Sequence, residues 1–318
     1  MTTGLRLLTF ALLAFSLALH TAGAQTGYYN LDSGRPTRIE DALPTPRGEL
    51  EAQFLPVRAE WIGGGTALQR IEPKLSYGVL PMTEIELRVP LVRSQSPGTV
   101  TTVGIASAAV SALHAFNVET RWPALALTGE VVLPVGSLSA PTTSYSIKGL
   151  LTKTLSFGRI EVNAGGGTWS LRLPPPGPVA TPNQCGDPGQ PPCLPPDVPC
   201  SVTPANAAGL SFACAPSTIA ALSTAAPGTQ RGTGPHWTAA LGFDHTFPLV
   251  STLIVGDVVV DRFMGLYPLN DWTAELGMRK QLTPRIVGDL GLSRRFAGTT
   301  QATWATLGVS YSMPLVRD

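Results

Sequence analysis

The stretch RIEPKLSYGVLPMTEIELRVPLV, residues 70–92, alternates between apolar and charged side chains with a period of two. In its second half Ile85 and Leu87 fall on one face of an extended chain, and Glu86 and Arg88 fall on the other. The short sequence LPMT separates this half from a similar one before it. The pattern predicts a β-hairpin with one apolar and one charged face, in a chain that is only 14% charged.

Segments of the same period recur as far as the C-terminus, and their connections alternate in length. LPMT, SFG, PLVS and LTP are short, whereas SQSPGTVTT, SLSAPTT and FMGLYPLN are longer. Alternation of tight turns and larger loops is typical of a transmembrane barrel. We therefore predict an all-β, up-and-down antiparallel barrel of about 12 strands, whose apolar face meets lipid. The predicted strands are 49–61, 69–79, 84–93, 104–117, 124–136, 144–155, 159–172, 236–247, 252–262, 271–281, 285–294 and 302–313.

Charged residues on the other face of these strands are the candidate groups that line the lumen. They are Glu72, Lys74, Glu84, Glu86, Arg88, Glu130, Lys148, Glu161, Glu275, Arg279 and Asp289. Because both signs are present, they favour neither a strong anion pore nor a strong cation pore. Two roles stay open: the charges pair and fill a narrow lumen, or they line a path for small solutes.

Two of the predicted strands depart from the simple pattern. Segment 49–61 changes phase at Pro56, which predicts a β-bulge or an edge position. Segment 252–262 is apolar on both faces, so the pattern does not assign its inward side. Aromatic residues near the strand ends predict girdles at the membrane interfaces, with ordinary packing as the alternative. These residues are Tyr77, Trp122, Trp237, Trp272, Trp304 and Tyr311.

The chain begins with the pattern of a secretory signal peptide over residues 1–24. Arg6 precedes an apolar run that is too short to span a bilayer, and small residues end it. Residues 25–48 are predicted to form an N-terminal periplasmic lead-in, because this part is polar and contains prolines. The barrel is predicted over 49–314. The 33 glycines and 30 prolines of the chain disfavour helices.

A long stretch, 173–235, is rich in proline, nearly uncharged and holds all four cysteines. It is predicted to be a long extracellular loop, either folded inward as a constriction or outward as a surface feature. An even number of cysteines in an exported chain predicts two disulfides, with three possible connectivities. The cysteines lack the short spacing of structural zinc sites. They are Cys185, Cys193, Cys200 and Cys214.

No motif for catalysis or cofactor binding is present. The sequence has no G-x-S-x-G elbow, zinc-binding H-E-x-x-H, P-loop or dinucleotide fingerprint. His114, His236 and His245 lack the paired spacing of metal ligands. A net charge of +1 does not indicate a nucleic-acid partner. We therefore predict a protein that is not an enzyme and uses no cofactor or metal.

Three stretches resemble a known family. They are RPTRIEDALPTPRGELEAQF (35–54), LSYGVLPMTEIELRVPL (75–91) and LALTGEVVLPVG (125–136). They are similar to outer-membrane proteins associated with the meta pathway of phenol degradation, which are described as transporters. The resemblance implies a monomeric β-barrel channel for aromatic or other hydrophobic small molecules, without catalytic residues.

The expected function is an outer-membrane channel or transporter for small molecules. Its expected partners are outer-membrane lipid, the solutes themselves and the machinery that assembles outer-membrane barrels, with a monomer favoured. Two alternatives stay open: a structural or adhesive surface protein that displays the long loop, and a lipid hydrolase embedded in the barrel wall.

Overall fold

The computed structural model describes most of the predicted barrel. The described residues are 28–32, 35–63, 65–95, 101–173, 201–203, 211–213, 230–265, 270–298 and 300–315. The expected signal peptide and the four cysteines lie outside these ranges. Of the predicted loop, 173–235, the structure describes a small hairpin, formed by β11 (Ser201–Thr203) and β12 (Ser211–Ala213), and the two ends, which belong to β10 (Gly158–Leu173) and β13 (Gln230–Phe247). No helix in the described part of the chain is long and apolar enough to cross a membrane.

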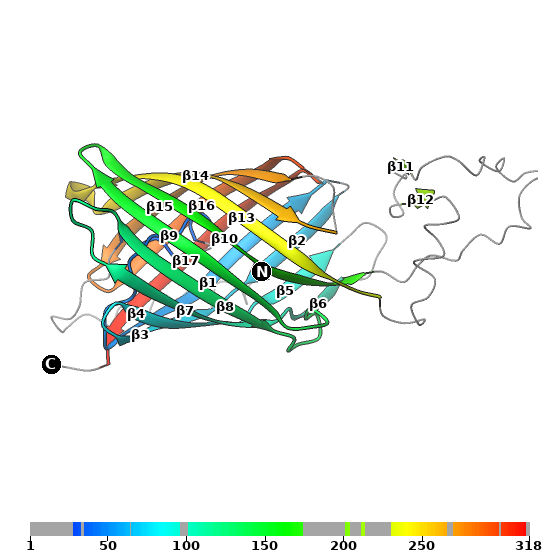
Figure 1. Ribbon diagram of the computed structural model, residues 1–318, viewed down its shortest axis with the longest axis horizontal. Helices are drawn as coiled ribbons and strands as arrows, with labels where there is room; N and C mark the ends of the chain where they lie inside the picture. Colours follow the sequence, from blue (N-terminus) through cyan, green and yellow to red (C-terminus); the bar gives the residue numbers. More distant parts are fainter. Residues whose placement is uncertain are drawn as a thin grey trace, which may run out of the picture.

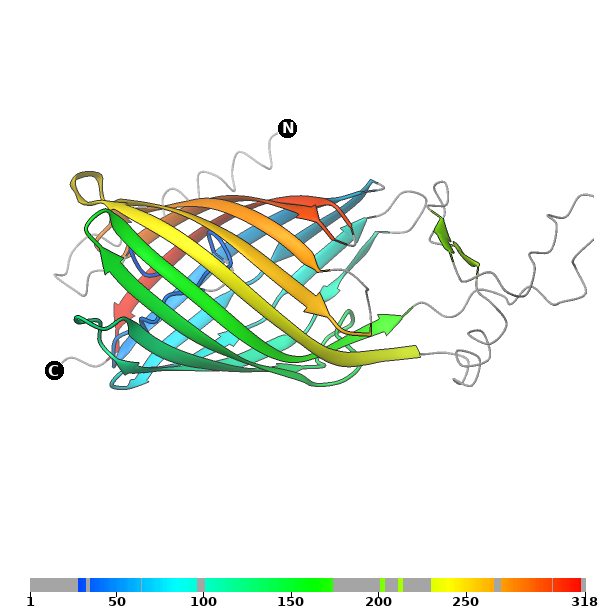
Figure 2. The same ribbon diagram turned by 45° about the horizontal axis from the view of Figure 1, so that its top comes forward.

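Fifteen strands form one antiparallel sheet, which closes into a barrel because β1 (Glu49–Ile62) pairs with β17 (Ala302–Pro314) (Figures 1 and 2). Three places in the wall hold two short strands end to end, so the barrel has twelve strand positions. The other strands are β2 (Thr66–Ile71), β3 (Lys74–Leu80), β4 (Thr83–Arg88), β5 (Leu91–Gln95), β6 (Thr102–Ile105), β7 (Ala108–Asn117), β8 (Ala124–Leu133), β9 (Ser144–Leu155), β10 (Gly158–Leu173), β13 (Gln230–Phe247), β14 (Thr252–Phe263), β15 (Asp271–Thr283) and β16 (Ile286–Ala297).

The predicted all-β, twelve-stranded antiparallel barrel is confirmed, because the pairing of β1 with β17 joins the two ends of the wall. The predicted bulge in the first strand is also confirmed, since the pairing of β1 with β17 shifts between Phe54 and Val57. Proline explains two of the divided strands, because it has no N–H to donate. β2 ends before Pro73, and β4 ends before Pro90.

The two faces of the wall differ in the way that a barrel in lipid requires. Leu276, Leu290 and Leu307 project outward and are more than half exposed. Glu161 and Arg279 project inward and are fully buried. Apolar side chains outside and charged side chains inside are the reverse of a water-soluble β-protein.

A charge on the outward face should therefore destabilise the barrel. Leu276 lies midway along β15 and is 61% exposed, so Leu276→Arg should lower the free energy of unfolding by about 2–4 kcal/mol. The measurement is urea unfolding of the protein refolded in vesicles. Leu249→Arg is the control, because Leu249 is fully exposed in the turn η2 (Pro248–Val250). Equal losses for the two variants would contradict the assignment of the outward face to lipid.

The chain before β1 folds back into the barrel. We call the described residues 28–32 and 35–47 the lumenal segment. It enters at the end of the barrel that holds the short turns, where Gly48 N–H donates to the Gly78 carbonyl (2.8 Å). Figures 1 and 2 show its dark-blue trace inside the wall, and Thr37, Ile39 and Ala42 are at most 1% exposed. The N-terminal lead-in over residues 25–48 stays a prediction, and hydrogen bonds and apolar contacts hold the described part of this polar, proline-bearing stretch in the lumen.

Candidate functional site in the barrel lumen

The lumenal segment has little regular structure, and its backbone is satisfied by side chains of the wall. Buried N–H groups need partners, and carboxylates are strong acceptors for them. Five N–H groups find side-chain acceptors on five different strands, and three of these acceptors are carboxylates. Arg38 donates to Glu275 (2.6 Å), Ile39 to Asp257 (2.8 Å), Glu40 to Asn163 (2.9 Å), Ala42 to Thr152 (2.9 Å) and Thr45 to Glu84 (2.6 Å).

Ion pairs fix residues 35–40 of the segment to the wall. Arg35 pairs with Asp289 (2.9 Å), and its guanidinium also donates to the Ser310 hydroxyl (3.2 Å). Arg38 bridges Asp261 (2.6 Å) and Glu275 (2.9 Å). Lys148, from the opposite side, pairs with Glu40. The segment is therefore held by cations and anions of its own, each matched to an opposite charge in the lumen.

Arg159 organises the base of the segment. Its guanidinium pairs with Asp244 (2.8 Å), Asp41 (3.4 Å) and Glu161 (3.6 Å), and it donates to the Tyr29 carbonyl. Asp41 also accepts the N–H of Leu31 (3.0 Å), so the two arms of the segment are joined. One buried cation thus contacts three carboxylates, one from the segment and two from the strands.

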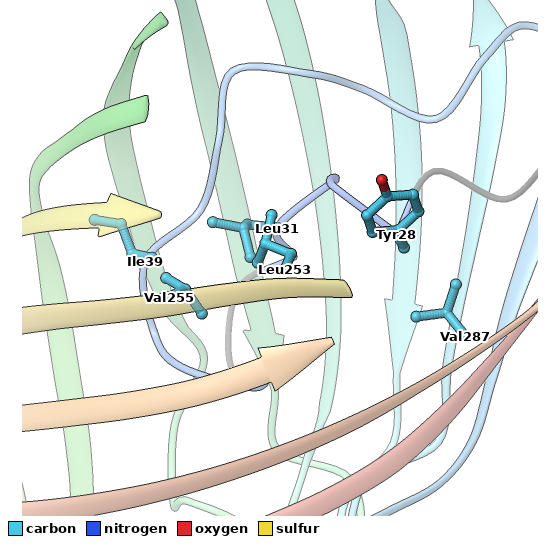
Figure 3. Packing of buried hydrophobic residues seen from close by; sticks show 6 residues of the cluster. All are labelled: Tyr28, Leu31, Ile39, Leu253, Val255 and Val287. Atoms are coloured by element: carbon cyan, nitrogen blue, oxygen red, sulfur yellow. The ribbon is translucent and has the colours of Figure 1, made fainter. Parts of the chain in front are cut away.

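Apolar contacts also hold the segment against the wall. Figure 3 shows Tyr28, Leu31 and Ile39 of the segment against Leu253, Val255 and Val287 of the wall. On another part of the wall, Ala42 packs with Leu113, Ala115, Ala124, Ala126 and Leu150. Burial of a side chain such as leucine or isoleucine contributes about 1.5–3 kcal/mol. These contacts explain why segment 252–262 is apolar on both faces: one face meets lipid, and the other meets the lumenal segment.

Glycines in the wall give the segment room. An added Cβ at Gly277 would lie 2.5 Å from Pro36 Cγ, and one at Gly242 would lie 2.7 Å from Ile39 Cγ1. At Gly291 and Gly78 it would overlap carbonyl oxygens of the segment. These strands therefore carry glycine where the segment crosses them.

The structure places all eleven predicted lumen-lining residues on the inner side of the wall, in two groups. One group pairs within the wall: Lys74 with Glu86 (2.9 Å), Arg88 with Glu72 (3.2 Å) and with Glu130, and Glu161 with Arg159 (3.6 Å). The other group contacts the lumenal segment: Glu84, Lys148, Glu275, Arg279 and Asp289. The sequence analysis did not identify the segment's own charged residues as part of the site. The signal was four charged residues within seven positions: Arg35, Arg38, Glu40 and Asp41.

Between the lumenal segment and the wall, the described residues enclose a larger and a smaller cavity. The larger, of about 220 Å³, lies against Arg58, Arg70, Lys74 and Arg88 of the wall and Arg35 and Arg38 of the segment. The smaller, of about 180 Å³, is lined by Glu40, Glu84, Glu86, Glu130, Lys148 and His236, among others. Arg88 borders both cavities, so they adjoin at its side chain.

One aromatic residue lies elsewhere than predicted. Trp304 is 2% exposed and faces the lumen, where the Arg58 guanidinium lies 4.1 Å from the centroid of its ring. Trp304 therefore belongs to no interface girdle, because it sits on the polar face of β17. Trp122 and Trp272 are exposed, at 71% and 41%. Within the described ranges, no group of three or more His, Cys, Asp or Glu side chains is arranged to hold a metal ion.

Comparison with known proteins supports the fold. No family model matches the sequence, and no curated protein matches it. Among solved structures, an outer membrane channel from Pseudomonas putida F1 has a TM-score of 0.50 at 12% identity, over 89% of this chain and 100% of that one. The NanC porin has a TM-score of 0.46 at 10% identity, over 81% of this chain and 98% of that one. The CymD monoaromatic hydrocarbon channel has a TM-score of 0.41 at 8% identity, over 86% and 90%. The chain shares the barrel fold of the Pseudomonas channel.

Proposed function

We propose that this protein is an outer-membrane channel that lets small molecules cross, and that its lumenal segment closes the short-turn end. The observation that carries the proposal is the charged lumen, in which two adjoining cavities lie beside the segment. A barrel that only displayed a surface loop would need neither the cavities nor the closure. A lipid hydrolase would use the outer wall, where the described strands present apolar side chains such as Leu276, Leu290 and Leu307.

The second part of the proposal concerns the chemical class of the transported solute. The family resemblance implies aromatic or other hydrophobic small molecules. The described lumen adds a requirement, because its wall carries paired charges from Lys74 and Glu86 to Arg88 and Glu130. A solute that passes through the lumen should therefore carry a polar or charged group along with any apolar part.

Closure by the segment implies that solutes pass beside it or displace it. The ion pairs of the segment, such as that of Arg35 with Asp289, join the segment to strands of the wall. The barrel itself does not depend on them, since β1 pairs with β17 and completes the wall. A barrel without the segment should therefore remain folded around a water-filled lumen.

Liposome swelling tests the channel. Refolded protein and a variant that lacks residues 28–46 are compared in liposomes with uncharged sugars of increasing size. The deletion variant should admit small sugars severalfold faster than wild type, because the segment fills the lumen at the short-turn end. Both proteins should exclude the largest sugars. Swelling no faster than in empty liposomes for both proteins, with the folded barrel verified by its shift on unheated gels, would contradict the proposal.

A further inference from the structure

Cations make up six of the ten residues that line the larger cavity, and Gln53, Val57, Glu72 and Thr306 are the others. Glu72 is the single carboxylate among the described residues that line it. The cations come from both sides: Arg35 and Arg38 from the segment, and Arg58, Arg70, Lys74 and Arg88 from the wall.

Two pairs of these cations stand directly opposite each other on neighbouring strands. Arg58 on β1 faces Arg70 on β2, and Lys74 on β3 faces Arg88 on β4. Like charges that are directly opposite in a sheet destabilise it. These two contacts between like charges therefore oppose the folding of the wall, and the neighbouring carboxylates reduce their cost.

Carboxylates beside these cations offset part of their charge. Arg58 pairs with Glu60 (2.9 Å), Arg70 with Glu72 (3.3 Å), and Glu72 is shared with Arg88 (3.2 Å). Hydrogen-bond donors are nevertheless left over. Among the described residues no partner exists for Arg38 Nη2, Arg58 Nε or Arg70 Nε.

We propose that this cavity binds the carboxylate group of a small organic anion. The planar guanidinium presents two parallel donors that match a carboxylate, and opposed arginines hold such a group from two sides. A single negative charge fits better than a phosphate dianion, because each lining cation already has a carboxylate partner. The volume of about 220 Å³ equals the share of about seven waters, which limits the anion to a small one. The proposal rests on the proposed channel function and names the class of its cargo.

Calorimetric titration of the folded protein in detergent at low salt tests the site. Benzoate is the probe, and benzamide is its uncharged counterpart of nearly the same shape. Benzoate should bind and benzamide should not. Arg70→Gln should weaken benzoate binding by about tenfold or more, because a charge-assisted hydrogen bond is lost. The fold should survive this change, since it relieves the repulsion with Arg58 and leaves Glu72 paired with Arg88.

The matched control is Arg93→Gln. Arg93 lies on β5 beside β2, but it is exposed and bonds to Gln69 (3.0 Å) away from the cavity. This variant should bind benzoate as wild type does. Equal binding of benzamide and benzoate, or equal losses in the two variants, would overturn the proposal. Absence of benzoate binding in wild type would also overturn it.

Planar-bilayer recordings on the same preparations separate this proposal from the channel function. Conductance without benzoate binding would leave the channel intact and remove the anion site. Benzoate binding that depends on Arg70, in a protein that conducts nothing, would keep the site and contradict the channel.

Discussion

The double variant Gly277→Val, Gly291→Val should conduct severalfold more current than wild type in single-channel recordings. Both glycines face the lumen at the place where Pro36 lies against the inner side of the wall. An added Cβ at Gly277 would lie 2.5 Å from Pro36 Cγ. Carbon atoms pack best at about 3.5–4.0 Å, so the larger side chains must push the segment away. At Gly277 the overlap is with the docked segment, and at Gly291 it is with the Pro36 carbonyl and with the Thr306 hydroxyl of β17. Each such overpacking costs about 1–3 kcal/mol. Valine is favoured in strands, so the barrel should remain folded.

Gly129→Val is the matched control. Gly129 lies on β8, and an added Cβ there meets no atom within 4 Å. This variant should conduct as wild type does. An unchanged conductance in the double variant, with both proteins folded, would mean that the segment does not limit the current.

Arg159→Met should lower the free energy of unfolding by about 3–5 kcal/mol, because removal of one partner leaves buried charges without compensation. Asp41, Glu161 and Asp244 would be left together, and Glu161 and Asp244 are fully buried. The variant also loses the hydrogen bond to the Tyr29 carbonyl. Urea unfolding of the refolded protein, followed by tryptophan fluorescence, gives the measurement.

Two further variants show whether charge balance is the cause. Arg93→Met removes an exposed arginine from the wall and should change the free energy of unfolding by no more than about 0.5 kcal/mol. Addition of Asp244→Asn to Arg159→Met removes one of the stranded charges and should recover part of the loss. A loss in Arg159→Met no larger than that in Arg93→Met would contradict the role given to this cluster.

The barrel could be predicted from the sequence because the residue pattern of each strand shows which of its side chains face lipid and which face the lumen. Alternation with a period of two places Leu276 outside and Glu275 inside without knowledge of any other strand. The phase change at Pro56 likewise signals the bulge between Phe54 and Val57 from local residues alone. The inward position of the charged residues follows from the same rule, once lipid is taken as the outer solvent.

The lumenal segment could not be predicted in this way, because its residues have no period and their partners are distant. Arg35 and Asp289 are 254 residues apart, and no local pattern connects them. One signal was nevertheless present. Leu253, Val255 and Val259 are apolar residues on the inward face of β14, where a water-filled lumen would favour polar ones. Apolar residues on both faces of a barrel strand thus indicate an object inside the barrel.

The central claim is that the chain before the barrel occupies the lumen, and hydrogen exchange on the wild-type protein in lipid nanodiscs tests it most directly. The amides of Arg38, Ile39, Glu40, Ala42 and Thr45 donate to side chains of the wall. Peptides that cover residues 36–46 should therefore exchange orders of magnitude more slowly than an unstructured chain, although they contain no strand or helix. Exchange of these peptides at the rate of an unstructured chain would contradict the account, because it would place the segment in free water outside the wall.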